Sequence, residues 1–294
     1  MSLDYFLAIP GKVVVAGYQP DGDSIRFIAD DPRLFLQLQR GNLIRPSQKD
    51  GSVQLRLEGI DAPETHYGIA AQPYGNTSRD RFLGLLGFNG LQYGQNSKTV
   101  VSSDPKAVEA TIFTRGAEVH GRPISYLFVG KTDTAVSGDT GPLGLSLLKQ
   151  TVNYGMVAAG HAYPLLYSST PTLHRAEIRN VAKLARATKS GIWAFDETEL
   201  FSLIDEESIG RSGSLIFPKL FRRCCDYLKI QGTSSVGGDL TDWLLRNPGE
   251  DDELFIETTS SVGGPYIHLH DLVSQRNSKI AIQSDVSELV FIEK

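Results

Sequence analysis

Alternating apolar and polar residues predict β-strands in the first two thirds of the chain. In residues 53–60, Val53, Leu55 and Leu57 form an apolar row, and Arg56 projects to the opposite side because a strand repeats every two residues. Clusters of Pro, Asp and Gly between such runs are typical of tight turns. The same pattern predicts further strands at residues 6–17, 24–29, 108–115 and 124–129.

Apolar residues three and four positions apart predict helices at residues 76–87, 145–162 and 172–188. In the first of these, Phe82, Leu85 and Leu86 share one face. The last carries basic side chains at helical spacing, which we interpret as a solvated face, with contact to phosphates as the alternative. These side chains are Arg175, Arg179, Lys183 and Arg186.

The order of these elements predicts the fold class. Five strands with a helix between the third and the fourth follow the order of an OB barrel. Antiparallel strands with helices at one end are typical of the α+β class. We therefore predict that residues 1–200 form an OB-fold five-stranded β-barrel with about three helices.

The composition changes after Phe195. Residues 196–213 are acidic and contain Gly and Ser, so we interpret them as a linker. Beyond them we predict helices at residues 214–230 and 240–246, and short strands or turns at residues 254–258, 266–273, 279–283 and 288–292. Residues 201–294 are therefore predicted to form a small acidic α+β accessory domain of unknown role.

The net charge of −5 is unevenly distributed along the chain. Residues 1–200 hold 20 Lys and Arg against 19 Asp and Glu, whereas residues 201–294 hold 9 against 15. Proteins that bind nucleic acids tend to be basic, and this chain as a whole is not. We expect any phosphate-handling site to lie in the first two thirds and to depend on local charge.

Three features bear on the cellular compartment. Only Cys224 and Cys225 are present, and two adjacent cysteines exclude a disulfide framework. No apolar run approaches the roughly 18 residues of a membrane span, so we expect no membrane contact. The N-terminus lacks a basic leader and a long apolar region, which favours the cytoplasm unless it is a processed form.

Two aspartates at predicted strand ends are candidates for a metal site. Asp23 lies at the tip of the first hairpin, and Asp61 follows the third strand. In a small closed barrel these ends can meet, and facing carboxylates repel unless a cation or a proton lies between them. Ca²⁺ suits such a place, because it accepts carboxylates, carbonyls and water. The alternative is that Asp23 belongs only to a turn.

Arg56, Arg122 and Glu64 complete a set of groups suited to phosphate chemistry. Two guanidinium groups can fork onto phosphate oxygens, and a glutamate can serve as a base for water. Pro63 fixes its own backbone and holds Ala62 extended, so the segment is stiff. A metal, two guanidinium groups and a carboxylate suffice for in-line attack on a phosphodiester. Taken singly, each is as readily a solvated strand or loop residue.

The segment Arg56–Thr65, RLEGIDAPET, resembles the signature of the staphylococcal (thermonuclease, micrococcal) nuclease family. The resemblance covers residues 8–195 approximately and continues through Gln72-Pro73-Tyr74-Gly75, His120-Gly121-Arg122, Val152-Asn153 and Gly191-Ile192-Trp193. It implies an OB-fold enzyme that hydrolyses DNA or RNA with Ca²⁺ and little sequence preference. The implied products carry 5′-hydroxyl and 3′-phosphate ends.

The resemblance also implies roles for single residues. Position by position, it assigns Asp23, Asp61 and the carbonyl of Ala62 to calcium, Arg56 and Arg122 to the scissile phosphate, and Glu64 to the activation of water.

The substrate contacts depart from the family pattern. Ala62 replaces the usual threonine, and Val119-His120 replaces a Lys-Tyr pair. Tyr163 and Tyr167 fall near the nucleotide-stacking tyrosines, with a shifted register. We take His120, Tyr163 and Tyr167 as candidate substrate-binding residues.

Two other functions stay open. A nucleic-acid-binding OB module without turnover is the first, although the complete set of site residues argues against it. The second concerns residues 201–294, which could bind a protein partner or a second copy of the chain. There, His268 and His270 alternate on a predicted strand face, where a structural role is expected before a metal site.

Overall fold

The computed structural model describes residues 5–95, 98–131, 137–231, 238–258 and 264–293. The chain forms two compact units, and each is described by itself. The first unit contains Met1–Glu58 and Arg79–Met156, and the second contains Gly59–Ser78 and Val157–Lys294. The predicted domains, 1–200 and 201–294, stay a prediction, because the compact units follow packing rather than sequence order.

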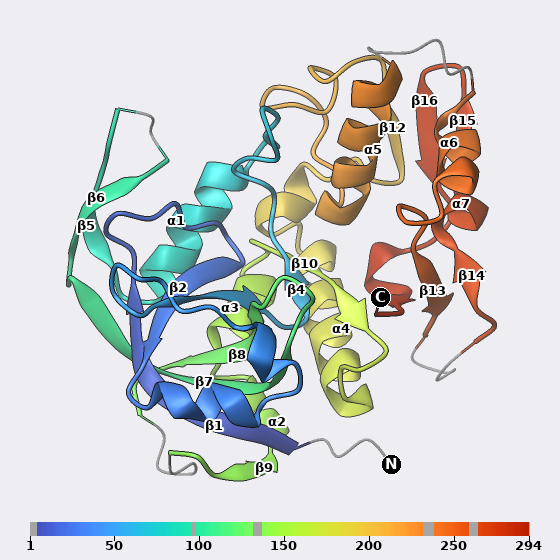
Figure 1. Ribbon diagram of the computed structural model, residues 1–294. Helices are drawn as coiled ribbons and strands as arrows, with labels where there is room; N and C mark the ends of the chain where they lie inside the picture. The colour runs from blue at the N-terminus through green and yellow to red at the C-terminus, as the bar shows by residue number, and fades with distance from the viewer. Residues whose placement is uncertain (1–4, 96–97, 132–136, 232–237, 259–263, 294) are drawn as a thin grey trace. The chain divides into compact units, whose positions relative to one another are not determined.

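A closed five-stranded β-barrel makes up most of the first unit (Figure 1), as the sequence predicts. Its strands are β1 (Tyr5–Val14), β2 (Ser24–Ala29), β3 (Val53–Leu57), β7 (Ala107–Ala117) and β8 (Pro123–Val129). They pair in the order β1-β2-β3-β8-β7 and close by the pairing of β7 with β1. Only the contact of β3 with β8 is parallel within this barrel. The buried row Val53, Leu55 and Leu57 lies in the core, as alternation requires. The OB-fold prediction is confirmed.

Further strands and helices lie between and after the barrel strands in sequence. The 3₁₀ helices η1 (Pro32–Gln37) and η2 (Gly41–Leu43) follow β2, and β9 (Thr140–Pro142) pairs with β1. The hairpin of β5 (Asn89–Tyr93) and β6 (Val100–Asp104) is absent from the sequence prediction, because its residues are mostly exposed and do not alternate. The helices are α1 (Gly75–Leu85), α2 (Leu145–Leu148) and α3 (Val152–Ala158).

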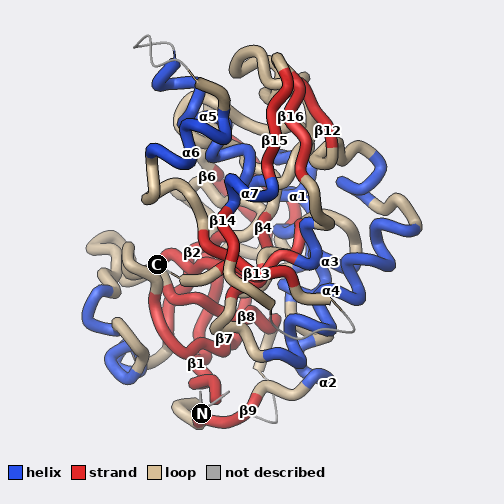
Figure 2. The backbone as a smooth tube through the Cα atoms, turned by 90° about the vertical axis from the view of Figure 1, so that its right-hand side faces the viewer, coloured by secondary structure: helices blue, strands red, loops and turns tan. Residues whose placement is uncertain are grey.

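The second unit is built from two small sheets, a strand pair and several helices. One sheet has the order β11-β17-β13-β14 and the other β12-β16-β15, whose strands lie side by side in Figure 2. The strands are β11 (Leu166–Tyr167), β12 (Leu200–Ser202), β13 (Glu253–Ile256), β14 (Ile267–His268), β15 (Val273–Arg276), β16 (Lys279–Ile282) and β17 (Leu289–Phe291). The separate pair is β4 (Ile60–Asp61) with β10 (Tyr163–Pro164). The helices are α4 (Thr172–Ala187), η3 (Gly191–Ala194), α5 (Pro218–Gln231), α6 (Leu240–Arg246), α7 (Leu269–Leu272) and η4 (Val286–Glu288).

The basic side chains of α4 do not form a solvated or phosphate-binding face. Arg175 and Arg179 are buried and both bind the carboxylate of Glu257, at 2.8 and 2.7 Å. Lys183 pairs with Glu288 at 2.7 Å. Both sequence interpretations of this stripe are wrong, because its partners come from the acidic C-terminal region. The stripe fixes that region to α4.

Residues 196–213 are not a linker either. Phe201 and Ile209 are 1% and 0% exposed, and β12 pairs with β16. They share one apolar core with Tyr163, Trp193 and Phe217. The acidic composition misled the prediction, because the few apolar residues of this stretch are the ones that pack. Residues 266–273, predicted as short strands or turns, contain strand β14 and also the helix α7, which the prediction lacks.

Candidate functional site

Strand register brings Asp23, Arg56 and Arg122 to one end of the barrel in the first unit. Strand β2 begins at Ser24, whose Cα is paired with that of Arg56. On its other side Arg56 is paired with Ile124, two residues after Arg122. The register therefore places these three residues at neighbouring strand ends, whereas the expected meeting of Asp23 with Asp61 stays a prediction.

Arg122 is held within its own turn by Glu118. Its Nε lies 3.1 Å from Oε1 of Glu118, and its backbone N–H donates to the same oxygen at 3.0 Å. Burial would raise the pKa of Glu118, but the hydrogen bonds and charge of Arg122 outweigh this and hold that pKa below its usual value. Gly121 has a φ of +79°, which favours glycine at this turn. The Arg122 side chain is 34% exposed and that of His120 78%, so both reach solvent.

Asp61, Ala62 and Glu64 lie in the second unit. Asp61 is fully buried in β4, where its backbone is paired with that of Tyr163, and Ala62 is also buried. Gln72 holds the backbone of Glu64 on both sides: its side-chain Oε1 accepts from the N–H of Glu64 at 3.1 Å, and its N–H donates to the Glu64 carbonyl at 2.9 Å. The segment that carries both carboxylates is therefore rigid.

Both carboxylates are bound by Arg222, a residue that the sequence analysis missed. Nη1 and Nη2 of Arg222 lie 3.1 and 2.9 Å from Oδ1 and Oδ2 of Asp61, and Nη1 lies 2.5 Å from Oε1 of Glu64. The side chains are 0% exposed for Asp61, 15% for Glu64 and 18% for Arg222. A guanidinium group is therefore clamped between the predicted metal ligand and the predicted base.

Electrostatics keep Arg222 charged in this place. Burial alone would lower its pKa, but the charges of Asp61 and Glu64 and their hydrogen bonds outweigh burial and raise it well above the usual value. Two-point binding of a carboxylate by a guanidinium is among the stronger pairings in proteins, and low exposure strengthens it further. Arg222 therefore stays protonated where it binds these carboxylates.

Helix α5 holds Arg222 in position. Its residues Phe221, Cys224 and Cys225 are buried in the core of the second unit, and burial raises the pKa of the Cys224 thiol well above its usual value. Asp226, one turn further on, accepts a hydrogen bond from Tyr67 at 2.7 Å. These thiols serve packing, and the helix face beside them is fixed against the segment that follows β4.

Two further contacts join that segment to the C-terminal region. The side-chain Nε2 of Gln72 donates to the carbonyl of Ile216 at 2.6 Å, and Nη2 of Arg211 donates to the carbonyl of Thr65 at 3.3 Å. Gln72 therefore connects Glu64 with the residues just before α5. The ion pair of Arg222 is one part of a broader attachment.

The two tyrosines occupy different surroundings. Tyr163 is fully buried, donates to Asp196 at 2.8 Å, and packs against Trp193 and Phe217. A base cannot stack on an enclosed ring, so a substrate role of Tyr163 has no support in this structure. Tyr167 is partly buried, with its ring 6.2 Å from that of Phe291.

The donors at Asp61 and Glu64 suit a hard cation. Carboxylate oxygens are the ligands that Ca²⁺ takes, and these two carboxylates already share one cationic partner. A calcium ion at Asp61 would take the place that Arg222 holds. The donor atoms are of the kind that calcium takes, and in this structure Arg222 occupies both oxygens of Asp61.

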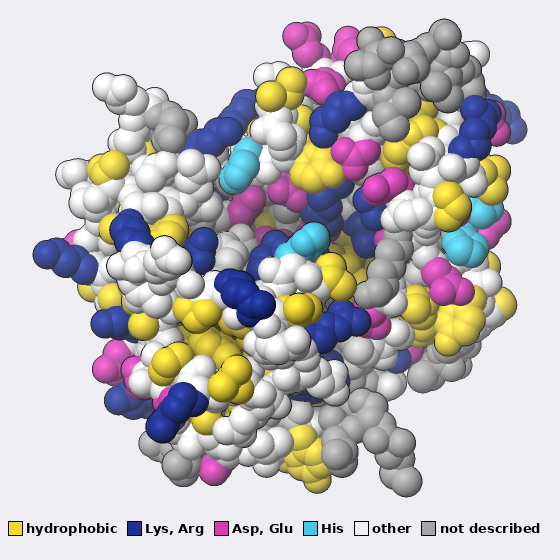
Figure 3. Space-filling model, in the orientation of Figure 1, with side chains coloured by type: hydrophobic (Ala, Val, Ile, Leu, Met, Phe, Trp, Pro, Cys, Tyr) yellow, Lys and Arg dark blue, Asp and Glu magenta, His cyan; other side chains and the backbone are white. Residues whose placement is uncertain are grey.

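Surface charge is mixed. On the face in Figure 3, Lys and Arg side chains are interspersed with Asp and Glu rather than gathered into one continuous basic surface. This mixture agrees with the small net charge of −5. In the part of the chain that the structure describes, no helix has the length and apolarity needed to cross a membrane.

Residues 54–195 match the family model described as "Staphylococcal nuclease homologue". This range is just under half of the chain and includes Arg56, Asp61, Glu64 and Arg122, whereas Asp23 precedes it and Arg222 follows it. A search of curated proteins finds no match. The resemblance stated from the sequence is confirmed over the matched residues.

Proposed function

Because residues 54–195 match the model of the staphylococcal nuclease homologue family, we propose that the chain hydrolyses phosphodiester bonds of DNA or RNA. The proposed reaction depends on calcium, has little sequence preference, and leaves 5′-hydroxyl and 3′-phosphate ends. The observation that supports it best is the convergence of the Asp61 and Glu64 carboxylates on one cation. Two carboxylates that already share one cation could bind a metal ion at the same position.

The proposed roles follow the chemistry of each side chain. Asp23, Asp61 and the carbonyl of Ala62 would hold calcium, which when bound supplies positive charge to the reacting phosphate. Arg56 and Arg122 donate hydrogen bonds to phosphate oxygens, where two fixed cations stabilise the growing charge. Positioning and electrostatics supply most of the rate in phosphoryl-type transfer, so few side chains suffice.

Glu64 takes the proton of the attacking water in this proposal. In the arrangement described above, Oε1 of Glu64 accepts a hydrogen bond from Arg222 at 2.5 Å, and both oxygens of Asp61 are engaged as well. Arg222 therefore has to leave before Glu64 can receive a proton or Asp61 a metal. We take the described arrangement as the closed form of the site.

A second candidate is nucleic-acid binding without hydrolysis. The same ion pair favours it, because a nearly enclosed arginine that stays in place would supply permanently the charge of a metal. The side chain of Arg222 is only 18% exposed, and α5 is tied down by several contacts. In that case the domain would bind phosphates through Arg56 and Arg122 and release them unchanged.

Digestion assays on the full chain separate the two candidates. Supercoiled plasmid, single-stranded DNA and RNA are incubated with millimolar Ca²⁺ or with EGTA, using wild type, Arg222→Gln and Arg223→Gln. The control Arg223 lies on the same helix but pairs with Asp252, so it carries the same charge change away from the site. Direct labelling of the products by a polynucleotide kinase, without prior phosphatase treatment, reports 5′-hydroxyl ends.

Hydrolysis predicts cleavage with Ca²⁺, none with EGTA, and at least a tenfold higher rate for Arg222→Gln than for Arg223→Gln. If neither wild type nor Arg222→Gln cleaves any substrate while both retard it in gels, the binding function is correct. Circular dichroism of each variant shows whether it is folded.

A further inference from the structure

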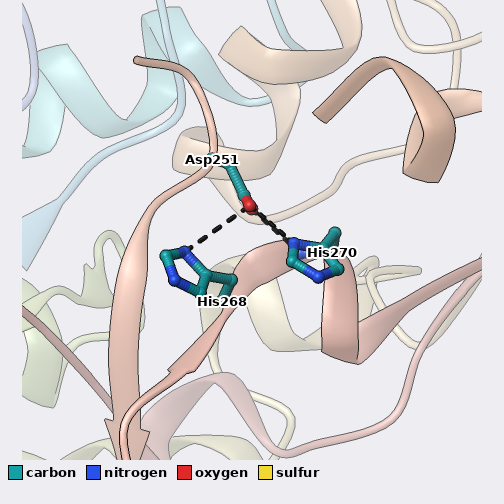
Figure 4. Close-up of side chains that lie close together, drawn as sticks. All are labelled: Asp251, His268 and His270. Atoms are coloured by element: carbon teal, nitrogen blue, oxygen red, sulfur yellow. Dashed lines mark hydrogen bonds and ion pairs between the residues drawn. The ribbon is translucent and has the colours of Figure 1, made fainter. Parts of the chain in front are cut away.

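Asp251, His268 and His270 form a cluster in the second unit (Figure 4). Strand pairing creates it: β13 and β14 are antiparallel, with Glu253 opposite His268. Continuing that register by two residues places Asp251 opposite His270. The N–H of Leu269 donates to the carbonyl of residue 252 at 2.9 Å, which keeps the two chain segments together just beyond the strands.

One carboxylate oxygen of Asp251 faces both imidazoles. Its Oδ2 lies 2.5 Å from Nδ1 of His270 and 3.5 Å from Nδ1 of His268. The two rings are stacked, with centroids 5.6 Å apart and planes at 16°. The other oxygen, Oδ1, accepts a hydrogen bond from the backbone N–H of His270 at 3.1 Å. The three ligand atoms therefore lie within 4.8 Å of one another, and both imidazoles are paired with the carboxylate.

We propose that Asp251, His268 and His270 bind a zinc ion. Zinc takes imidazole nitrogen and carboxylate oxygen at about 2.0–2.2 Å, so two ligand atoms of a tetrahedral site are about 3.3 Å apart. The separation of 3.5 Å between His268 and Asp251 already fits this value. The pair of His270 and Asp251 has to open by about 1 Å, a small rotation of a side chain that is 21% exposed.

The surroundings of His270 resemble those of a metal ligand. Its second ring nitrogen, Nε2, lies 3.3 Å from Oδ1 of Asp271. A carboxylate on the far nitrogen of a histidine orients the ring and raises its basicity toward the metal. Asp271 is itself fixed, because its Oδ2 accepts from the backbone N–H of His268 at 2.9 Å. Asp271 thus orients the ring of His270 and fixes the backbone of His268.

Exposure indicates where a fourth ligand would come from. The side chains are 6% exposed for Asp251, 21% for His270 and 48% for His268. The carboxylate is enclosed and the imidazoles open toward solvent, so water can complete the coordination. Asp251 lies just before β13, His268 ends β14, and His270 lies in α7. The ion would therefore join two chain segments that are far apart in sequence and stabilise the second unit.

The competing explanation is a hydrogen-bonded Asp–His pair without metal. Isothermal titration with Zn²⁺ tests both, using the full chain after removal of metals by EDTA and dialysis. Excess Ca²⁺ is kept present to occupy acidic sites elsewhere. The variants are Asp251→Asn, His268→Ala and His270→Ala, with His120→Ala as a control for loss of an exposed histidine. His268 is half exposed, so His268→Ala should fold even if the others do not.

The expected result is one zinc per chain for wild type and His120→Ala, and at least tenfold weaker binding for each folded cluster variant. Zinc should also raise the melting temperature of wild type but not of His268→Ala. Visible absorption of the Co²⁺-loaded protein should report tetrahedral coordination and disappear in His268→Ala. Absence of saturable binding in wild type, or equal affinity in wild type and His268→Ala, overturns the proposal. None of these measurements depends on nuclease activity.

Discussion

The guanidinium of Arg222 binds both carboxylate oxygens of Asp61, at 2.9 and 3.1 Å, across 161 positions of sequence. Asp61 is fully buried, so this pairing satisfies a charge that would otherwise be costly. It also occupies the oxygens that calcium would need. The same contact therefore stabilises the second unit and opposes the proposed activity.

Arg222→Gln should be unstable without calcium and recover when calcium is added. Removing one partner of a nearly buried ion pair costs about 3–5 kcal/mol, because the remaining carboxylates are left without a cation. Calcium at a hundred times its dissociation constant would return about 2.7 kcal/mol. Urea unfolding of wild type, Arg222→Gln and Arg223→Gln, each with Ca²⁺ and with EGTA, measures this. Equal calcium effects on all three would contradict a shared cation locus.

Substitutions of Asp61 and Glu64 should change different kinetic properties of the proposed nuclease. Asp61→Asn removes a proposed calcium ligand, so the calcium concentration for half-maximal cleavage should rise at least tenfold. Glu64→Gln removes the proposed base, so turnover should fall by about 10²–10⁴ with a smaller change in calcium requirement. Rates measured over a calcium series, on the Arg222→Gln background if wild type is slow, show the difference. The assignment fails if both variants shift the same parameter.

The stability of the second unit should fall in acid through Glu257. Burial would raise its pKa, but bonds from Arg175 and Arg179 outweigh this and hold it below the ordinary 4.5. The unfolded chain therefore binds a proton at higher pH than the folded one. The stabilisation is complete above about pH 4.5 and is lost as the pH falls through the folded-state pKa.

Glu257→Gln should reduce this pH dependence and lower stability at pH 7 by about 3–5 kcal/mol, since two buried arginines lose their carboxylate. Glu288→Gln breaks the more exposed pair with Lys183 and should cost about 1 kcal/mol or less. Denaturant midpoints of both variants and wild type at pH 4, 5 and 7 give the comparison. A wild type and Glu257→Gln with parallel pH profiles would exclude this origin of acid sensitivity.

Local patterns were sufficient to predict the barrel and the placement of three candidate residues at one end of its strands. Alternation in β3 sets which side Arg56 takes, and the turns around Asp23 and Arg122 put both at the ends of neighbouring strands. These are properties of a few consecutive residues. Strand register then determines which of these residues lie side by side. The register is itself constrained, because the apolar row that includes Leu55 has to be buried.

Local patterns could not predict which carboxylates the buried arginines bind. Nothing in the sequence next to Arg179 on α4 or Arg222 on α5 distinguishes these side chains from solvated arginines on a helix surface. Their burial depends on Glu257 and Asp61, which lie 78 and 161 positions away. No local pattern encodes a pairing over that distance, and the family resemblance ends before Arg222. The acidic C-terminal charge was a usable signal, since its excess of carboxylates matches the basic stripe of α4.

A chain that ends at residue 204 should fail to fold its second unit. Truncation there removes Phe217, which packs against Tyr163 with ring centroids 5.8 Å apart, together with Phe221 and Leu244 from the same core. It also removes Glu257, so Arg175 and Arg179 would face each other without a carboxylate. Because aromatic core residues would be exposed, the truncated chain should bind a hydrophobic dye strongly and show a broad thermal transition. The full-length variant Arg222→Gln with calcium should instead show a sharp thermal transition. If residues 1–204 instead unfold cooperatively and cleave DNA, residues 205–294 belong to an independent accessory domain, and the stabilising role of Arg222 at Asp61 is refuted.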